Sequence, residues 1–251
     1  MSAPRVLVAA GLDPTGGAGL AADVEALLGV GARALPVATA LTVQAPGGAV
    51  DYESVPARFV VAQIEGLFRG RGARPAAVKT GMLGSGANAA AIARLFAGGP
   101  LEGLPLVVDP VLAASSGLPL LADARGRPPA DVLAPLLACA TVATPNWPEL
   151  AALAAGEVST DDDAVEAART LGCAAVLVKG GHRRGAPVDF LVRGHEVRRF
   201  EGRRRAGTAR GTGCRLASGI AGLLAQGASL EAAVTGAKRL VERYLDAESR
   251  G

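Results

Sequence analysis

The sequence predicts an α/β fold in which helices cover both faces of a mostly parallel sheet. Short apolar runs alternate with stretches of helical spacing along most of the 251 residues. Several of the runs are continuous rather than alternating, which is typical of strands buried on both faces. No linker, charge block or change in composition divides the chain. We therefore expect residues 1–251 to form a single domain.

The expected strands and helices follow one another in turn. The strands lie at 5–11, 34–41, 75–81, 104–111, 140–145 and 173–181, and the helices between them at 18–29, 57–69, 86–97, 129–137, 147–155 and 162–171. Ser54 and Pro56 mark the start of the second helix, and Thr160 with Asp163 resembles a capping box for the sixth. Repeated strand–helix–strand units favour a parallel sheet.

A hairpin and two helices complete the predicted fold. Residues 188–200 predict a β-hairpin whose two-residue turn is Arg193-Gly194. The last two helices are expected near 213–226 and 229–246. Glu231 lies in the first turn of the second, where a negative charge complements the helix dipole.

Composition excludes several classes of function. Aromatic residues make up only 3% of the chain, which argues against stacking on single-stranded nucleic acid, and no nucleic-acid motif is present. No apolar stretch is long enough to span a membrane or to serve as a signal peptide. The three cysteines are far apart and form no CxxC pair, which disfavours a zinc site or a disulfide framework. We expect a cytoplasmic protein that binds small molecules and neither nucleic acid nor membrane.

Residues suited to binding follow the predicted strands. Ligands of open parallel sheets bind beyond the carboxyl ends of the strands. Polar residues, glycines and one methionine occupy these positions here, at Gly11 and Asp13, Thr42 and Gln44, Lys79 and Met82, Asp109, Asn146, and Lys179. The sequence therefore predicts a ligand site at this edge of the sheet.

Asn146 and Glu149 lie three residues apart at a strand-to-helix junction, and two interpretations are open. They form a capping box, or they hold a hydrated Mg²⁺ beside a nucleotide phosphate. Asp109 ends an apolar strand and suits the same cation. Its alternative is a turn residue before Pro110.

The run Gly211-Thr212-Gly213-Cys214 opens directly into a predicted helix. Glycines let backbone N–H groups turn toward one point, and the helix adds its positive end, so an anion site is expected. A thiol there has its pKa lowered by the helix terminus. Cys214 is thus either a poised base or nucleophile, or a small apolar residue that packs at the helix start.

Gly17, Gly19 and Ala22 resemble the GxGxxA of dinucleotide-binding folds. That motif also needs an acid about twenty residues on, to hold the ribose hydroxyls. The second predicted strand ends without one, and no GxxxxGK[ST] phosphate loop occurs. An NAD(P)-dependent oxidoreductase is therefore the weakest of the alternatives.

Taken together, the motifs resemble the hydroxymethylpyrimidine/phosphomethylpyrimidine kinase family of the ribokinase-like superfamily. The similar stretches are distributed along essentially the whole chain, at 6–44, 78–84, 107–121, 144–150, 176–182 and 211–214, and include AGLDPTGGAGLAAD, VKTGMLG, VVDPV, TPNWPEL, VLVKGGH and GTGC. The resemblance implies a ribokinase-like three-layer α/β/α sandwich with a mostly parallel central sheet and an edge hairpin at 187–200. It also implies an ATP- and Mg²⁺-dependent transfer of phosphoryl groups to a hydroxymethylpyrimidine and to its monophosphate, by a homodimer.

The resemblance also implies residue roles. Gln44 would hydrogen-bond the aminopyrimidine, and the pocket around it would be lined by Gly11, Asp23, Thr42 and Met82. Asp109 and Glu149 would hold the metal and the phosphates, and Lys179 would face a phosphate. Asn146 and Arg210 are further candidates for the nucleotide site that come from the sequence itself and not from the resemblance. Gly211, Thr212 and Gly213 would form the anion hole, with Cys214 in the catalytic position.

Two arginines depart from the family pattern. Members carry a histidine before GTGC and Thr-Leu-Ser after it, whereas this chain has Arg210 before and Arg215-Leu216-Ala217 after. The two guanidiniums would contact ATP phosphates, contact the phosphate of a monophosphate substrate, or face solvent. Two other functions stay open: a pyridoxine/pyridoxal kinase and a non-catalytic pyrimidine-binding protein of the same fold.

Overall fold

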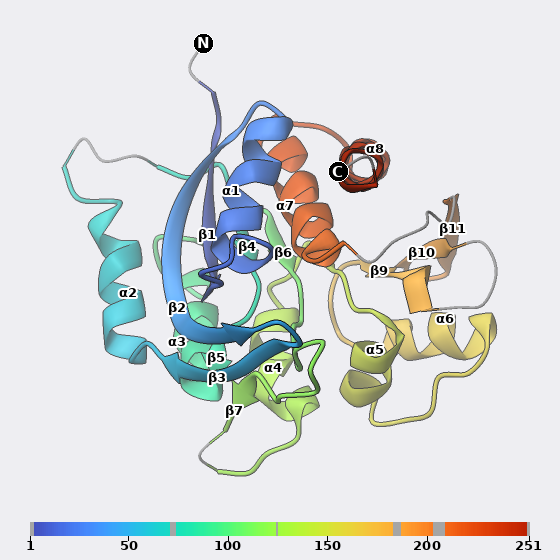
Figure 1. Ribbon diagram of the computed structural model, residues 1–251, viewed down its shortest axis with the longest axis horizontal. Helices are drawn as coiled ribbons and strands as arrows, with labels where there is room; N and C mark the ends of the chain where they lie inside the picture. Colours follow the sequence, from blue (N-terminus) through green and yellow to red (C-terminus); the bar gives the residue numbers. More distant parts are fainter. Residues whose placement is uncertain (1–2, 71–73, 124, 183–186, 203–208, 250–251) are drawn as a thin grey trace.

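A large sheet forms the middle layer of the computed structural model, which describes residues 3–70, 74–123, 125–182, 187–202 and 209–249 (Figure 1). Within these residues the sheet has nine strands in the order β11-β10-β9-β8-β6-β4-β1-β2-β3, and β5 pairs with β7 apart from it. The strands are β1 (Arg5–Leu12), β2 (Arg33–Ala45), β3 (Gly48–Ser54), β4 (Ala77–Thr80), β5 (Gly84–Ser85), β6 (Leu106–Val108), β7 (Leu121–Ala122), β8 (Val142–Ala143), β9 (Val176–Val178), β10 (Val188–Arg193) and β11 (Glu196–Glu201).

The six strands expected from apolar runs form the parallel part of the sheet, β2-β1-β4-β6-β8-β9. The fold class predicted from the sequence is therefore confirmed. Strand β3 was not predicted: it pairs antiparallel with an extension of β2 and leaves large apolar side chains such as Val50 exposed. A strand with so little burial lacks the apolar pattern on which the prediction depends.

The predicted hairpin is present at the other edge, where β10 and β11 pair antiparallel. Its turn is shifted by one residue, because Arg193 pairs with Glu196 and the turn residues are Gly194 and His195. Gly194 adopts a φ of 54°. Two-residue hairpin loops need a positive φ at their first position, so the glycine stands first in the turn rather than second.

Helices cover both faces of the sheet. They are α1 (Gly19–Gly29), α2 (Ala57–Gly66), α3 (Gly86–Phe96), α4 (Pro129–Leu137), α5 (Trp147–Ala154), α6 (Asp161–Thr170), α7 (Thr212–Leu224) and α8 (Leu230–Glu248), with a 3-10 turn η1 (Gly180–His182) after β9. Residues of α2 to α6 pack into one apolar cluster, and residues of α1, α7 and α8 pack into a second. The two clusters are the outer layers of a three-layer α/β/α sandwich (Figure 1).

Strand β1 shows why its run is continuously apolar. Leu7 and Ala9 belong to the first cluster, whereas Val6 and Val8 belong to the second. Successive side chains of a strand point to opposite faces. Because helices cover both faces, every residue from Val6 to Ala10 is buried.

The connections leave the sheet in opposite directions at its centre. The chain passes from β1 through α1 to β2 on one side, and from β4 through α3 toward β6 on the other, although β1 and β4 are neighbours. Such a switch opens a crevice at the carboxyl ends of the strands. No helix in the described part of the chain is long and apolar enough to cross a membrane.

Candidate active site

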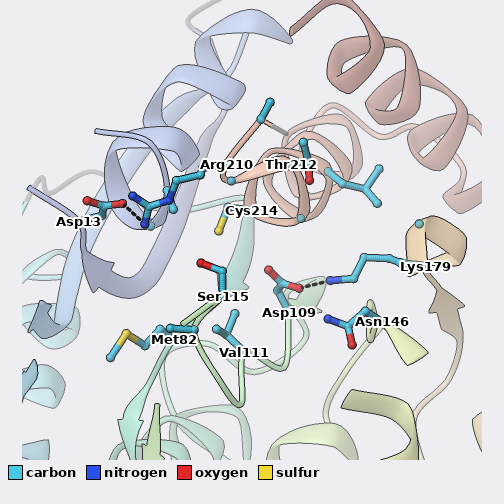
Figure 2. A pocket seen from close by; sticks show the side chains of 18 of the residues that line it. Asp13, Met82, Asp109, Val111, Ser115, Asn146, Lys179, Arg210, Thr212 and Cys214 are labelled. Atoms are coloured by element: carbon cyan, nitrogen blue, oxygen red, sulfur yellow. Dashed lines mark hydrogen bonds and ion pairs between the residues drawn. The ribbon is translucent and has the colours of Figure 1, made fainter. Parts of the chain in front are cut away.

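One cavity of about 940 Å³ lies at this crevice, between the carboxyl ends of the strands and the start of α7 (Figure 2). Nearly all the residues singled out from the sequence line it together: Gly11, Thr42, Gln44, Met82, Asp109, Asn146, Glu149, Lys179, Arg210, Gly211, Thr212, Gly213 and Cys214. They come from segments spread over 200 residues of chain. The fold brings them together because they lie at or just beyond the carboxyl ends of strands, or at the start of a helix, along the same edge of the sheet.

Asp23 is the exception among the predicted substrate-binding residues. Its side chain is fully buried on α1 and accepts hydrogen bonds from Lys79 Nζ at 2.8 Å and 2.9 Å, and from Ser218 Oγ at 2.8 Å. The carboxylate therefore lies behind the cavity wall, not among its lining residues. Its role in the structure is to hold Lys79, which does line the cavity.

Lys79 and Asp23 form an ion pair in which both side chains are 0% exposed. Burial alone lowers the pKa of Lys79, but the charges of Asp23, Cys214 and Asp109 and the hydrogen bond with Asp23 together outweigh it and raise that pKa, so the ammonium stays charged. Burial raises the pKa of the Asp23 carboxyl despite its lysine partner. The sequence predicted that Lys79 follows a strand, but the residue lies within β4. The sequence contained no signal for its pairing with Asp23 across 56 residues.

The start of α7 requires its two glycines. Gly211 is the N-cap with a φ of 70°, and a Cβ there would lie 2.2 Å from the carbonyl oxygen of Gly17. A Cβ on Gly213 would lie 3.3 Å from Lys179 Nζ. No side chain caps the first turn of this 13-residue helix. Its N–H groups at the cavity are therefore suited to an anion, as the sequence predicted.

Cys214 points into this cavity, between the pair of Arg210 with Asp13 and the pair of Lys179 with Asp109 (Figure 2). The sequence predicted a lowered pKa for its thiol, and this was wrong. Burial raises the pKa of Cys214 to about 11, although the nearby Lys79 ammonium acts in the opposite direction. Loss of hydration disfavours the thiolate more strongly than the Lys79 charge and the backbone hydrogen bond with Gly19 stabilise it.

Lys179 joins the two carboxylates predicted for the metal. Its Nζ lies 2.8 Å from Asp109 Oδ1 and 3.7 Å from Glu149 Oε2. Burial opposes the ionised form of Asp109, but the charges of Lys179 and Lys79 prevail and hold its pKa below the usual value. Burial raises the pKa of Glu149 against the charge of Lys179.

Asn146 and Glu149 form the capping box that the sequence left as one of two interpretations. Asn146 N donates to Glu149 Oε2 at 2.8 Å, and Glu149 N donates to Asn146 Oδ1 at 2.9 Å. On the Glu149 carboxylate this capping box uses only Oε2. On the Asp109 carboxylate, Lys179 and Thr144 both contact Oδ1. The other oxygen of each carboxylate is therefore left for a cation.

No group of three or more acidic, histidine or cysteine residues is gathered for a metal within the described residues. Mg²⁺ binds through one or two carboxylates and completes its shell with waters and substrate phosphates. The pair of Asp109 and Glu149 beside an anion-binding helix start fits that requirement. It would not suit a metal that needs a full set of protein ligands.

Arg210 and Arg215 have different surroundings. Arg210 lines the cavity, and its Nη2 lies 2.9 Å from Gln44 Oε1 and 3.3 Å from Asp13 Oδ2. Arg215 is buried behind the α7 start: its guanidinium pairs with Glu25, stacks 3.7 Å from the Tyr244 ring centroid, and donates to the carbonyl oxygens of Gly17 and Arg210. Arg215 therefore braces the glycine loop and does not line the cavity.

Several lining residues were not among the predicted site residues. Asp13 was noted only as a residue after the first strand. Lys238 and Glu242 reach the cavity from α8, and Gly48 and Ser115 reach it from β3 and the 113–119 loop. Nothing local in the sequence marks these four, because they approach the site only through the packing of distant elements.

Comparison with known proteins agrees with this site. The phosphomethylpyrimidine kinase family matches residues 13–250 of the chain. The chain is also 39% identical over 242 residues to the hydroxymethylpyrimidine/phosphomethylpyrimidine kinase of Streptomyces coelicolor, covering 95% of this chain and 87% of that protein. The chain belongs to the phosphomethylpyrimidine kinase family.

Solved structures show the same fold. The phosphomethylpyrimidine kinase of Clostridium difficile superposes with a TM-score of 0.78 at 31% identity, covering 97% of this chain and 99% of that one. The pyridoxal kinase of Bacillus subtilis, solved with ADP, superposes with a TM-score of 0.82 at 27% identity, covering 95% and 90%. The chain is thus a phosphotransferase with a ribokinase-like fold, and the motifs identified in the sequence point to the correct family.

Proposed function

We propose that this kinase transfers the γ-phosphoryl group of ATP to 4-amino-5-hydroxymethyl-2-methylpyrimidine and then to its monophosphate, a step of thiamine biosynthesis. The observation that carries the proposal is a single cavity with three chemically distinct parts. The N-terminus of α7 lies between a polar wall at Gln44 and Thr42 and the charged group of Asp109, Glu149 and Lys179. The names of the curated relatives support the same substrates.

The wall at Gln44 suits an aminopyrimidine. Met82 packs against the backbone of Gly11, where a Cβ would lie 2.8 Å from the methionine sulfur. The thioether and Val111 form an apolar surface for a ring face (Figure 2). Gln44 and Thr42 present polar atoms for a ring edge. An apolar pocket with a few placed polar groups is the common form of a small-molecule site.

The opposite end suits the nucleotide phosphates. Asp109 and Glu149 would hold Mg²⁺, which neutralises charge on the β- and γ-phosphates when bound. Lys179 keeps its proton between these carboxylates, because their charges raise its pKa against the effect of burial. The N–H groups of Gly211 to Gly213 would receive the oxygens of the transferring phosphoryl group. Phosphoryl transfer needs mainly such positioning and charge neutralisation.

Cys214 would orient the attacking hydroxymethyl group, with its sulfur accepting the hydrogen bond of that hydroxyl. With a pKa of about 11, the residue is a thiol at neutral pH in the free protein. Loose phosphoryl-transfer transition states keep the proton on the nucleophile until the new P–O bond is well formed. The proton then passes to an oxygen of the transferred phosphoryl group or to water, so a positioned group is needed more than a strong base. Lys79, held by Asp23, places a positive charge near the sulfur and acts to lower the pKa of the thiol.

ADP release with Mg·ATP tests the proposal, with hydroxymethylpyrimidine, its monophosphate and pyridoxal offered separately. Turnover of both pyrimidines, lost in Cys214→Ala, is the expected result. The resemblance to pyridoxal kinases makes that activity the second candidate, and a preference for pyridoxal would reject our reading. Tight pyrimidine binding without any turnover would identify a non-catalytic binding protein.

Homodimer assembly and a cytoplasmic location stay predictions from the resemblance and the sequence. Light scattering after size-exclusion chromatography measures the first directly. Fluorescence microscopy of a tagged chain measures the second.

A further inference from the structure

We propose that Arg210 positions the side-chain amide of Gln44 and thereby makes the pocket selective for a ring that carries an amino group. The inference rests on the proposed function and adds a residue that determines specificity. Arg210 acts through Gln44 and is a positioning residue. Its side chain is 41% exposed at the cavity, so it is not needed to fill the core.

The contact between the two side chains has only one possible polarity. Arg210 Nη2 lies 2.9 Å from Gln44 Oε1. A guanidinium is always charged and can only donate hydrogen bonds. The amide atom that faces it must therefore be the oxygen, and a flipped amide would place two donors against each other.

The other end of the amide is fixed by Thr42. Thr42 Oγ1 donates to the carbonyl oxygen of Leu12 at 2.9 Å, which uses its only hydrogen. Toward Gln44 the hydroxyl is then an acceptor, and Gln44 Nε2 donates to it at 2.9 Å. A directed chain of hydrogen bonds thus runs from Arg210 through Gln44 and Thr42 to the backbone. Both ends of the amide require the same orientation.

Arg210 is itself held in place. Its Nη2 lies 3.3 Å from Asp13 Oδ2, while Oδ1 of that carboxylate accepts from the backbone N and the hydroxyl of Thr15 at 2.8 Å and 2.7 Å. Its carbonyl oxygen accepts from Arg215 Nη1 and Tyr244 Oη, both at 3.2 Å. The guanidinium beside Gln44 is therefore anchored on its side chain and on its backbone.

The orientation has a consequence for the substrate. A carbonyl oxygen has two lone pairs, so Gln44 Oε1 can accept from Arg210 and from an exocyclic amine together. A ring with a carbonyl oxygen at the same position would place two acceptors against each other. Without Arg210, turning the amide over would break only neutral hydrogen bonds, because the Thr42 hydroxyl can rotate from Leu12 to donate to Gln44 Oε1. Gln44 Nε2 could then donate to the carbonyl oxygen of the ring. Arg210 thus prevents the adjustment that would admit the oxo ring.

The experiment compares kcat/KM for the aminopyrimidine and for its 4-oxo analogue. We expect Arg210→Met to lower the preference for the amino ring by about tenfold or more, as for loss of a hydrogen bond to a charged group. Arg58, an exposed arginine of α2, supplies the matched control, and Arg58→Met should leave the ratio unchanged. Calorimetric titration of both rings without ATP should show the same shift in relative affinity.

A second variant separates positioning from a general structural effect. In Gln44→Glu both carboxylate oxygens are acceptors, so turning the side chain over does not change what it presents to the ring. The double variant Arg210→Met with Gln44→Glu should therefore have the same amino-to-oxo ratio of kcat/KM as Gln44→Glu alone. An equal loss of preference in both backgrounds would overturn the proposal.

An amino-to-oxo ratio of kcat/KM that is the same in Arg210→Met as in the unaltered enzyme would also overturn the proposal. If that variant also has a raised KM for ATP or for the monophosphate, Arg210 is a phosphate ligand instead. If the unaltered enzyme phosphorylates neither pyrimidine, it is the proposed function that fails, and this is seen before any variant is made.

Discussion

Replacing Lys79 by methionine should destabilise the protein strongly, because it leaves the Asp23 carboxylate buried without its counter-charge. Both side chains are 0% exposed, and the lysine contacts both carboxylate oxygens of Asp23. Methionine fills most of the lysine volume, so the change removes charge more than packing.

The expected loss follows from this burial. Breaking a buried ion pair by removing one partner reduces the free energy of unfolding by about 3–5 kcal/mol. Ser218 still donates to Asp23 in the variant, which favours the middle of that range. About 4 kcal/mol lowers the Tm of a chain of this size by about 8–16 °C.

The loss should also depend on pH. Burial already raises the pKa of Asp23, and removing Lys79 raises it further. A group whose folded pKa lies above its unfolded value contributes stability at low pH, and that contribution is lost as pH rises through the folded pKa. Lys79→Met should therefore be less destabilised at pH 5 than at pH 8.

Urea unfolding followed by circular dichroism measures the effect at both pH values. The double variant Lys79→Met with Asp23→Leu removes both charges and should be more stable than Lys79→Met alone. Arg127→Met breaks a partly exposed pair with Asp123 and should change the midpoint far less. A Lys79→Met midpoint close to that of the unaltered protein at both pH values would refute the reasoning.

Two further predictions concern the start of α7. Gly211→Ala should lower kcat about a hundredfold by displacing the N–H groups at the start of α7, because its Cβ would lie 2.2 Å from the Gly17 carbonyl oxygen. Gly227→Ala is the control and should keep full activity, because Gly227 has a similar φ of 84° but open space around it. Carbamidomethylation of Cys214 by iodoacetamide, followed by mass spectrometry, should accelerate with pH up to about 11. A rate that levels off near neutral pH would instead show the thiolate that a helix terminus alone favours.

Much of the fold could be predicted from the sequence because the relevant forces are local. A strand such as β1 is apolar at every position since helices cover both of its faces, and Thr160 caps α6 through bonds within four residues. The position of the site followed from one general rule, that ligands bind beyond the carboxyl ends of parallel strands. Gln44, near the end of β2, and Lys179, directly after β9, were found on that basis.

The sequence by itself determined the order of the parallel strands and the helices along the chain, the glycine-rich start of α7 and the family. Only the tertiary structure decided which charges meet: Lys79 with Asp23, Arg210 with Gln44, and Arg215 away from the cavity. It also decided that burial raises the pKa of the Cys214 thiol. Local patterns record which face of an element is apolar. Contacts between distant residues, and the loss of water around them, exist only once the chain has folded.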